Sequence, residues 1–164
     1  MTKPKVLISD KMDPNAARIF EERGCDVDVI TGESPEELAA RIGEYHGLAI
    51  RSSTKVTPAI LDAATNLKVI GRAGIGVDNV DIPYASGKGV VVMNTPFGNS
   101  ITTAEHAIAM TMALARQVPA ANARTQAGEW PKKDFMGVEV TGKTVGMIGA
   151  GNIGSNFASS ALGL

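Results

Sequence analysis

The chain has 164 residues, of which 44% are hydrophobic and 20% charged, enough for one domain with a core or one domain and part of a second. The net charge of -1 provides no basic field for nucleic acid or an anionic membrane surface. One cysteine, Cys25, excludes an internal disulfide, and with two histidines offers too few soft ligands for a zinc or iron–sulfur site. No secretory signal or membrane span is apparent, so we expect a cytoplasmic protein without a bound metal.

Short apolar runs alternate with helical patterns over the first part of the chain. Asp13 before Pro14, and Ser34 before Pro35, have the residue types of helix N-termini. Such an alternation predicts an α/β domain over residues 1–97, a parallel sheet with helices on both faces. The predicted strands are 5–9, 27–30, 48–50, 67–70 and 90–93, and the predicted helices are 14–23, 38–42, 58–64 and 82–86.

A different pattern follows at residues 98–142. Residues 101–118 form a long helical run that is apolar or small on nearly every side, so this helix must be buried on every side. Glu105 and Arg116 argue against a membrane span, and we expect burial between two domains or two subunits. Residues 119–141 are polar and contain glycine and proline, which indicates an arm or an interface loop.

The last 22 residues, 143–164, contain a glycine motif between a predicted strand and a predicted helix. Residues 143–148 predict the strand, and Gly149, Gly151 and Gly154 are spaced as in a dinucleotide-binding turn. These glycines permit a tight turn, close approach of a diphosphate, and packing of the helix, whose N-terminus favours an anion. A glycine-rich turn in an unrelated unit is the alternative. The acidic residue expected about 20 positions later is not among the 164 residues, so NAD and NADP cannot be distinguished.

Two further segments follow predicted strands and carry arginine. Arg72 lies in a run whose glycines, from Gly71 to Gly76, can turn backbone amides toward a carboxylate or a phosphate. Arg51 is followed by Ser52, and a guanidinium group matches the geometry of an oxyanion. Because parallel sheets bind ligands at the carboxyl ends of their strands, both segments are candidate anion sites. A turn with a solvated Arg72, and a surface Arg51 beside a helix cap, are the alternatives.

Five segments together resemble the D-isomer-specific 2-hydroxyacid dehydrogenases, in order and in spacing. The resemblance covers the whole chain. Glyoxylate, formate and lactate dehydrogenases share its glycine motifs, whereas residues 51–57 and 94–100 are more particular to the branch that acts on 3-phosphoglycerate. The segments are 51–57, 71–81, 93–100, 103–106 and 141–154.

This resemblance implies a flavodoxin-like substrate-binding domain at 1–97, a dimerisation helix and arm at 98–142, and the start of a Rossmann NAD-binding domain at 143–164. It implies NAD-dependent oxidation of 3-phosphoglycerate to 3-phosphohydroxypyruvate, in serine biosynthesis, by a homo-oligomer paired through helix 101–118. Ile75 stands where the family often has threonine, which leaves a backbone or van der Waals contact. The implied substrate-binding residues are Arg51, Ser52, Arg72, Ala73, Gly74 and Asn99. The implied cofactor-binding residues are Ile75, Gly76, Thr103, Gly149, Gly151, Asn152, Ile153 and Gly154.

The family's catalytic Arg, Glu and His lie further along the chain than residue 164, so we expect no catalytic residue here and no activity from this chain alone. His46 and His106 are interpreted as structural. Three alternatives remain: a flavodoxin-like binding or assembly module that self-associates through helix 101–118, another dehydrogenase of the same family, and a corepressor-like relative that senses the dinucleotide.

Overall fold

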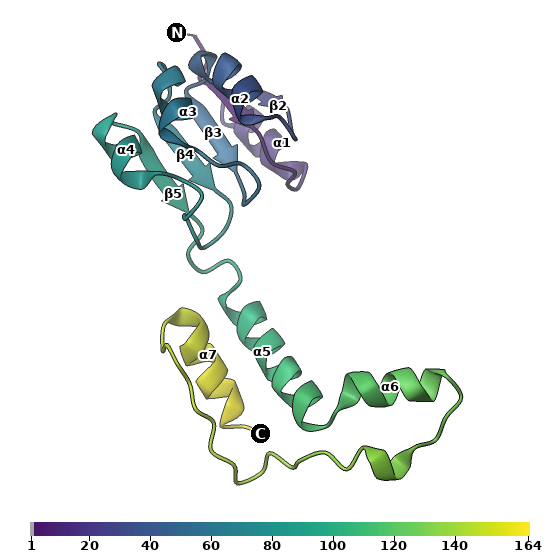
Figure 1. Cartoon of the computed structure of the whole chain (residues 1–164). Helices are drawn as coiled ribbons and strands as arrows, with labels where there is room; N and C mark the ends of the chain where they lie inside the picture. The colour runs from purple at the N-terminus through teal and green to yellow at the C-terminus, as the bar shows by residue number, and fades with distance from the viewer. Residues whose placement is uncertain (1) are drawn as a thin grey trace. The chain divides into compact units, whose positions relative to one another are not determined.

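Five four-residue strands form one parallel sheet in the computed structural model, which describes residues 2–164 (Figure 1). The strand order is β2-β1-β3-β4-β5, which is the flavodoxin-like order and confirms the predicted fold class. β4 both begins and ends two residues later than predicted, so Gly71 and Arg72 belong to the strand. The strands are β1 (Lys5–Ile8), β2 (Asp26–Val29), β3 (Gly47–Ile50), β4 (Val69–Arg72) and β5 (Val91–Asn94).

The strand order places the helices on two faces of the sheet. The chain moves from β1 to β2 in one direction, and from β2 through β3 and β4 to β5 in the other. Because parallel crossovers are right-handed, the first helix lies on the face opposite the next three. The helices are α1 (Asn15–Glu22), α2 (Pro35–Arg41), α3 (Pro58–Ala63) and α4 (Ile82–Gly87), with a short 3-10 turn, η1 (Ile42–Glu44), after α2.

The core lies between the sheet and the layer formed by α2, α3 and α4. Leu7, Ile50 and Ile70, from three neighbouring strands, are fully buried. Ile42 and Ile60 belong to the same core on the helix side. Burying a side chain of this size stabilises the fold by about 1.5–3 kcal/mol. No residue of α1 is buried. The main hydrophobic core of this unit is therefore on the α2–α4 side of the sheet.

The two predicted helix starts have different outcomes. Ser34 forms a complete capping box: its hydroxyl accepts from the Glu37 backbone at 3.2 Å, and the Glu37 carboxylate accepts from the Ser34 backbone at 2.8 Å. Asp13 was expected to cap α1, but the N-cap position is Pro14, without a side-chain cap. The Asp13 carboxylate instead accepts from the Asn15 backbone at 2.8 Å, which fixes the turn just before the helix.

Residues 99–164 form a second compact unit, separate from residues 1–98. Within it, α5 packs against α7. The helix predicted over 101–118 ends earlier, at Ala115, because Gln117 adopts a left-handed conformation (φ 53°). Residues 119–141, expected to form an arm or an interface loop, contain most of the further helix α6, with Pro119 in its first turn. The elements are α5 (Ser100–Ala115), α6 (Val118–Gln126), the 3-10 turn η2 (Lys132–Asp134) and α7 (Asn152–Ala161).

The strand predicted at 143–148 is not formed. Within residues 2–164 this segment pairs with no other strand, and all six residues are exposed. A β-strand requires hydrogen bonds from a neighbour, which the sequence of the segment itself cannot supply. The helix predicted after the glycine motif is present as α7.

The apolar surface of α5 is largely exposed in this chain. Ile101 is 64% exposed, Met110 57% and Leu114 81%, while only Ser100 and Ala104 are buried. Burial of this helix between domains or subunits therefore stays a prediction. No helix in the described part of the chain combines the length and apolar character needed to cross a membrane.

A polar cluster joins β1, β2 and the turn after η1. Tyr45, which is 2% exposed, donates its hydroxyl to Asp28 at 2.8 Å, and the Lys5 ammonium lies 3.3 Å from the same carboxylate. The Tyr45 hydroxyl, and then Lys5, lower the pKa of Asp28 below its ordinary value. Burial, and then the hydrogen bond to Asp28, raise the pKa of Tyr45.

We expect Tyr45→Phe to raise the pKa of Asp28 toward its ordinary value of 3.8, because the main donor to the carboxylate is lost. A lowered folded-state pKa contributes stability above the unfolded-state value, and this contribution is lost as the pH falls through the folded value. In the variant, the folded-state pKa of Asp28 lies closer to the unfolded-state value, so the stability that Asp28 loses on acidification is smaller. The measurement is an NMR titration of the Asp28 carboxyl carbon. Tyr84→Phe is the matched control, because Tyr84 donates to Asp62 and not to Asp28. An unchanged Asp28 titration in Tyr45→Phe contradicts the expectation.

Candidate functional site

The predicted anion-binding segments lie side by side at the carboxyl edge of the sheet. β3 pairs with β4 in a register that sets Ile50 opposite Arg72, and the Ala73 backbone donates to the Ile50 carbonyl at 2.8 Å. Arg51, the residue after β3, is therefore adjacent to the end of β4. We call residues 51–56 the Arg51 loop and residues 73–79 the glycine loop. The sheet brings together seven of the predicted residues: Arg51, Ser52, Arg72, Ala73, Gly74, Ile75 and Gly76.

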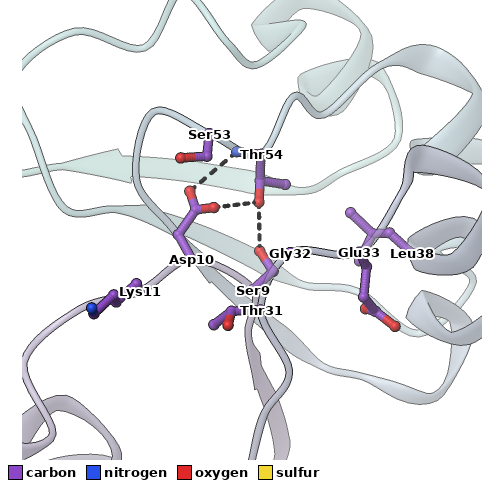
Figure 2. A pocket seen from close by; sticks show the side chains of 9 residues that line it. All are labelled: Ser9, Asp10, Lys11, Thr31, Gly32, Glu33, Leu38, Ser53 and Thr54. Carbon is purple, nitrogen blue, oxygen red and sulfur yellow. Dashed lines mark hydrogen bonds between the residues drawn. The ribbon is translucent and has the colours of Figure 1, made fainter.

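Asp10, the second residue after β1, fixes the backbone of the Arg51 loop (Figure 2). Its carboxylate accepts from the backbone N–H of Arg51 at 2.6 Å, from that of Thr54 at 3.2 Å, and from the Thr54 hydroxyl at 2.8 Å. The Ser9 and Thr54 hydroxyls are 2.9 Å apart. Asp10 is 5% exposed, and a buried carboxylate requires several donors of this kind. The loop is thereby held in one conformation.

Asp10 was not predicted as a site residue from the sequence. The available signal was its position, because it follows a buried strand at the same sheet edge as Arg51. A cavity of about 290 Å³ also lies at this edge, beyond the ends of β1, β2 and β3 and close to the point where the strand order reverses (Figure 2). Asp10, Ser53 and Thr54 are among the residues that line it. None of the predicted substrate-binding residues does so.

The two guanidinium groups contact different neighbours. Arg51 donates through Nη1 to the Lys11 carbonyl at 3.2 Å. The guanidinium group of Arg72 lies against Gly74, in the space that a Cβ would occupy there. The Nε atom of Arg72 is buried and has no acceptor within residues 2–164. A buried donor of this kind needs a partner, and an anionic ligand can provide one. That both arginines turn toward one anion stays a prediction.

The glycine loop is also attached to the end of β5. The Asn94 side chain donates through Nδ2 to the Ile75 carbonyl at 2.7 Å, and the Thr95 backbone donates to the Gly74 carbonyl at 3.0 Å. Two carbonyl groups of the loop are therefore already paired. The Ala73 and Gly74 amides are paired as well, with the Ile50 and Arg72 carbonyls, which leaves Nε of Arg72 as an unpaired donor among the described residues of this strand end.

The other predicted residues belong to the second unit. Asn99 is the N-cap residue of α5 without a side-chain cap, and its carbonyl accepts from the Thr103 backbone at 2.9 Å. These two residues occupy the first turn of α5. The predicted diphosphate-binding residues, from Gly149 to Gly154, occupy the turn before α7 and its first residues.

Two of the three motif glycines are required by the backbone of this turn. Gly149 has φ 96°, in the left-handed region. A Cβ on Gly154 would overlap the Gly149 carbonyl oxygen. Gly151 is the N-cap residue of α7, with open space beside its Cα and no side-chain cap on the helix. The backbone N–H groups at this helix end can therefore donate hydrogen bonds to a diphosphate, and the residues present fit that group.

The two histidines lie in different units, and His46 is at the sheet edge opposite the Arg51 and glycine loops. His46 accepts through Nδ1 from the Lys5 backbone at 3.1 Å, at the amino end of β1 and thus at the opposite sheet edge. His106 is on α5. In residues 2–164, no three His, Cys, Asp or Glu side chains are grouped so that they could hold a metal ion.

Comparisons with known proteins agree with this geometry. A family model described as the catalytic domain of D-isomer specific 2-hydroxyacid dehydrogenases matches residues 6–160. D-3-phosphoglycerate dehydrogenase of Archaeoglobus fulgidus is 47% identical over 154 residues, which are 94% of this chain and 29% of the relative. The protein of the same name from Homo sapiens is 49% identical over 155 residues, with the same two shares.

The fold comparison gives a solved structure of related description. The chain superposes on NAD+-bound 3-phosphoglycerate dehydrogenase of Entamoeba histolytica with a TM-score of 0.78 and 29% identity, over 99% of this chain and 51% of that one. The chain thus spans 29% of the length of the curated relatives named above and about half of this solved structure.

We expect Gly154→Ala to destabilise the second unit by about 1–3 kcal/mol, because the new methyl group would collide with backbone rather than with a movable side chain. Amide resonances of α7 and denaturant unfolding measure this effect. Gly146→Ala is the control, since its Cβ would meet no atom within 4 Å. Equal stability of the two variants would show that the turn before α7 differs from the one described.

Proposed function

Because the chain belongs to the D-isomer specific 2-hydroxyacid dehydrogenases, we propose that it is part of an enzyme that oxidises 3-phosphoglycerate to 3-phosphohydroxypyruvate with NAD. The observation that carries this proposal is the position of Arg51 and Arg72 at adjacent strand ends, in a chain 47% identical to a D-3-phosphoglycerate dehydrogenase. The reaction would serve serine biosynthesis, and we place the protein in the cytoplasm.

The chemistry of the substrate suits this sheet edge. 3-Phosphoglycerate is a three-carbon molecule with a carboxylate at one end and a phosphate at the other, so it requires two cationic contacts a short distance apart. We assign these to Arg51, assisted by the Ser52 hydroxyl, and to Arg72. Ala73 and Gly74 are proposed to lie beside the substrate without donating to it, because their amides already donate to the Ile50 and Arg72 carbonyls. Guanidinium groups bind carboxylates and phosphates through paired hydrogen bonds. The unpartnered Nε atom of Arg72 supports this assignment. Asn99 completes the proposed substrate contacts.

The cofactor assignment rests on the turn before α7. We propose that the amides of Gly151, Asn152 and Ile153 bind the diphosphate of NAD, with Gly149 and Gly154 shaping the turn. Ile75, Gly76 and Thr103 are proposed to contact the nicotinamide end. When bound, NAD supplies the acceptor for the hydride that leaves the substrate carbon.

The proton of the substrate hydroxyl requires a base, and His46 lies at the opposite edge of the sheet. The resemblance assigns that base, with the Glu that tunes it and the Arg that orients the carboxylate, to positions beyond residue 164. The role we propose for residues 2–98 is therefore to bind and orient the two anionic ends of the substrate.

We expect the 164-residue chain to bind 3-phosphoglycerate and to produce no NADH from it. Arg51→Gln and Arg72→Gln should each weaken binding about tenfold to a hundredfold, since a charge-assisted hydrogen bond contributes roughly 1.5–3 kcal/mol. The measurement is calorimetric titration, with NADH absorbance recorded in parallel. The control is Arg18→Gln, which removes the same charge from α1, where Arg18 pairs with Glu22. An equal loss in all three variants, or NADH production by the chain, contradicts the proposal.

A second role is favoured by the exposed apolar residues of α5. Ile101, Met110 and Leu114 lie on one helix and are 57–81% exposed, a surface that water solvates poorly. We propose that two copies of the chain pair through this helix. Light scattering at micromolar concentration should give the mass of a dimer, and Leu114→Lys should shift it toward the monomer. A monomeric mass for the unaltered chain contradicts the pairing.

A further inference from the structure

One side-chain amide joins the Arg51 loop to the glycine loop. Asn79 donates through Nδ2 to the Arg51 carbonyl at 2.8 Å and to the Thr54 carbonyl at 2.6 Å. Its own backbone carbonyl accepts from Val56 at 2.8 Å. Beside it, Val56 and Val80 form an isolated parallel bridge and are 1% and 6% exposed. These contacts continue the connection between the two loops beyond the last pair of the β3–β4 ladder.

The chemistry of this amide allows only one orientation. Both hydrogens of Nδ2 are directed at carbonyl oxygens, and Oδ1 is buried with no partner in the described chain. Rotating the amide by half a turn would place Oδ1 against two carbonyl oxygens at hydrogen-bond distance, which is repulsive. An unpaired buried acceptor is unfavourable in itself. Oδ1 of Asn79 thus remains unpaired within residues 2–164 while Nδ2 makes both contacts with the Arg51 loop.

Asn79 and Asp10 hold the Arg51 backbone from its two sides. Asp10 accepts from the Arg51 N–H at 2.6 Å, and Asn79 donates to the Arg51 carbonyl at 2.8 Å. Both polar groups of this backbone unit are therefore fixed. The guanidinium group donates through Nη1 to the Lys11 carbonyl and keeps its other donors for a ligand. Asp10 follows the end of β1, whereas Asn79 is the last residue of the glycine loop, which begins directly after Arg72.

We propose that Asn79 is a positioning residue that holds Arg51 and Arg72 at a fixed spacing, so that one anion with two charged ends contacts both. This inference rests on the proposed function, because it takes the two arginines as the substrate contacts. A fixed spacing matters for a molecule that must reach both cations at once. It matters little for a single phosphate ion, which one arginine can bind. The ratio of the two affinities therefore reports on positioning rather than on general stability.

The experiment compares Asn79→Ala with Asn66→Ala in the 164-residue chain. Asn66 makes the same kind of contact, from Nδ2 to the Gly43 carbonyl at 2.6 Å, but it precedes β4 and lies at the opposite sheet edge. The probes are 3-phosphoglycerate and inorganic phosphate, titrated separately. For Asn79→Ala we expect about tenfold weaker binding of 3-phosphoglycerate and less than about twofold for phosphate. Asn66→Ala should alter both by less than about twofold. Equal losses for the two probes, or no loss, overturn the proposal.

Amide hydrogen exchange without ligand provides a second readout, independent of the substrate assignment. In Asn79→Ala, the amides of Arg51 and Thr54 should exchange roughly tenfold faster, because the loop loses its attachment on one side. If the unaltered chain binds no 3-phosphoglycerate, the proposed function fails, and this exchange rate alone decides on Asn79: unchanged exchange overturns the positioning role. Should Asn79→Ala not fold, Asn79→Ser keeps a shorter donor and is measured in the same way.

Discussion

The parallel pairing of β3 with β4, with Ile50 opposite Arg72, is the constraint on which the candidate site depends. Parallel strands send all their carboxyl ends to one edge, and the crossover helices that make this possible supply the buried layer beneath them. Arg51 and Arg72 are far apart in sequence, yet the register makes them neighbours. A shift of one residue in this register would reverse the faces of β4 and bury the wrong side chains, so the core that fixes the register also fixes the spacing of the two arginines.

Polar side chains at the same edge hold the loops, which lie beyond the hydrogen bonds between the strands. Asp10 accepts from backbone N–H groups, whereas Asn79 and Asn94 donate to backbone carbonyls. Each uses a side chain from one strand end to fix the loop of a neighbour. Several backbone groups of the loops are thereby paired within the protein. The arginines keep donors for a ligand, since Arg51 donates through Nη1 alone and Nε of Arg72 has no acceptor in the described chain. A binding site held in this way loses little conformational entropy when its ligand arrives.

The sequence predicted those features that depend on local patterns. Alternating apolar runs and helix-start residues predicted the five strands, the parallel sheet with helices on both faces and the helix cap at Ser34, whereas the flavodoxin-like class was implied by the family resemblance. The roles of Asp10 and Asn79 were not predicted, because each depends on partners 25 or more positions away. Residues 143–148 were predicted as a strand that did not form, again because the outcome depends on a distant partner. Their composition favours a strand, but strand pairing is a property of two segments and not of one. The predicted long helix ends early because Gln117 has a left-handed backbone conformation, which cannot be predicted from a glutamine in the sequence.

The two anion sites differ in what they require from the rest of the fold. The site at Arg51 and Arg72 depends on long-range pairing, so it exists only when the whole sheet of residues 2–98 has formed. The turn before α7 depends on contacts within a few residues: the φ angle of Gly149, the missing Cβ of Gly154 and the uncapped end of a ten-residue helix. Because these are local, the turn is present although residues 143–148 pair with no strand in the described chain. The proposed diphosphate site is therefore set by its own short segment, whereas the proposed substrate site is set by the order in which the strands are arranged.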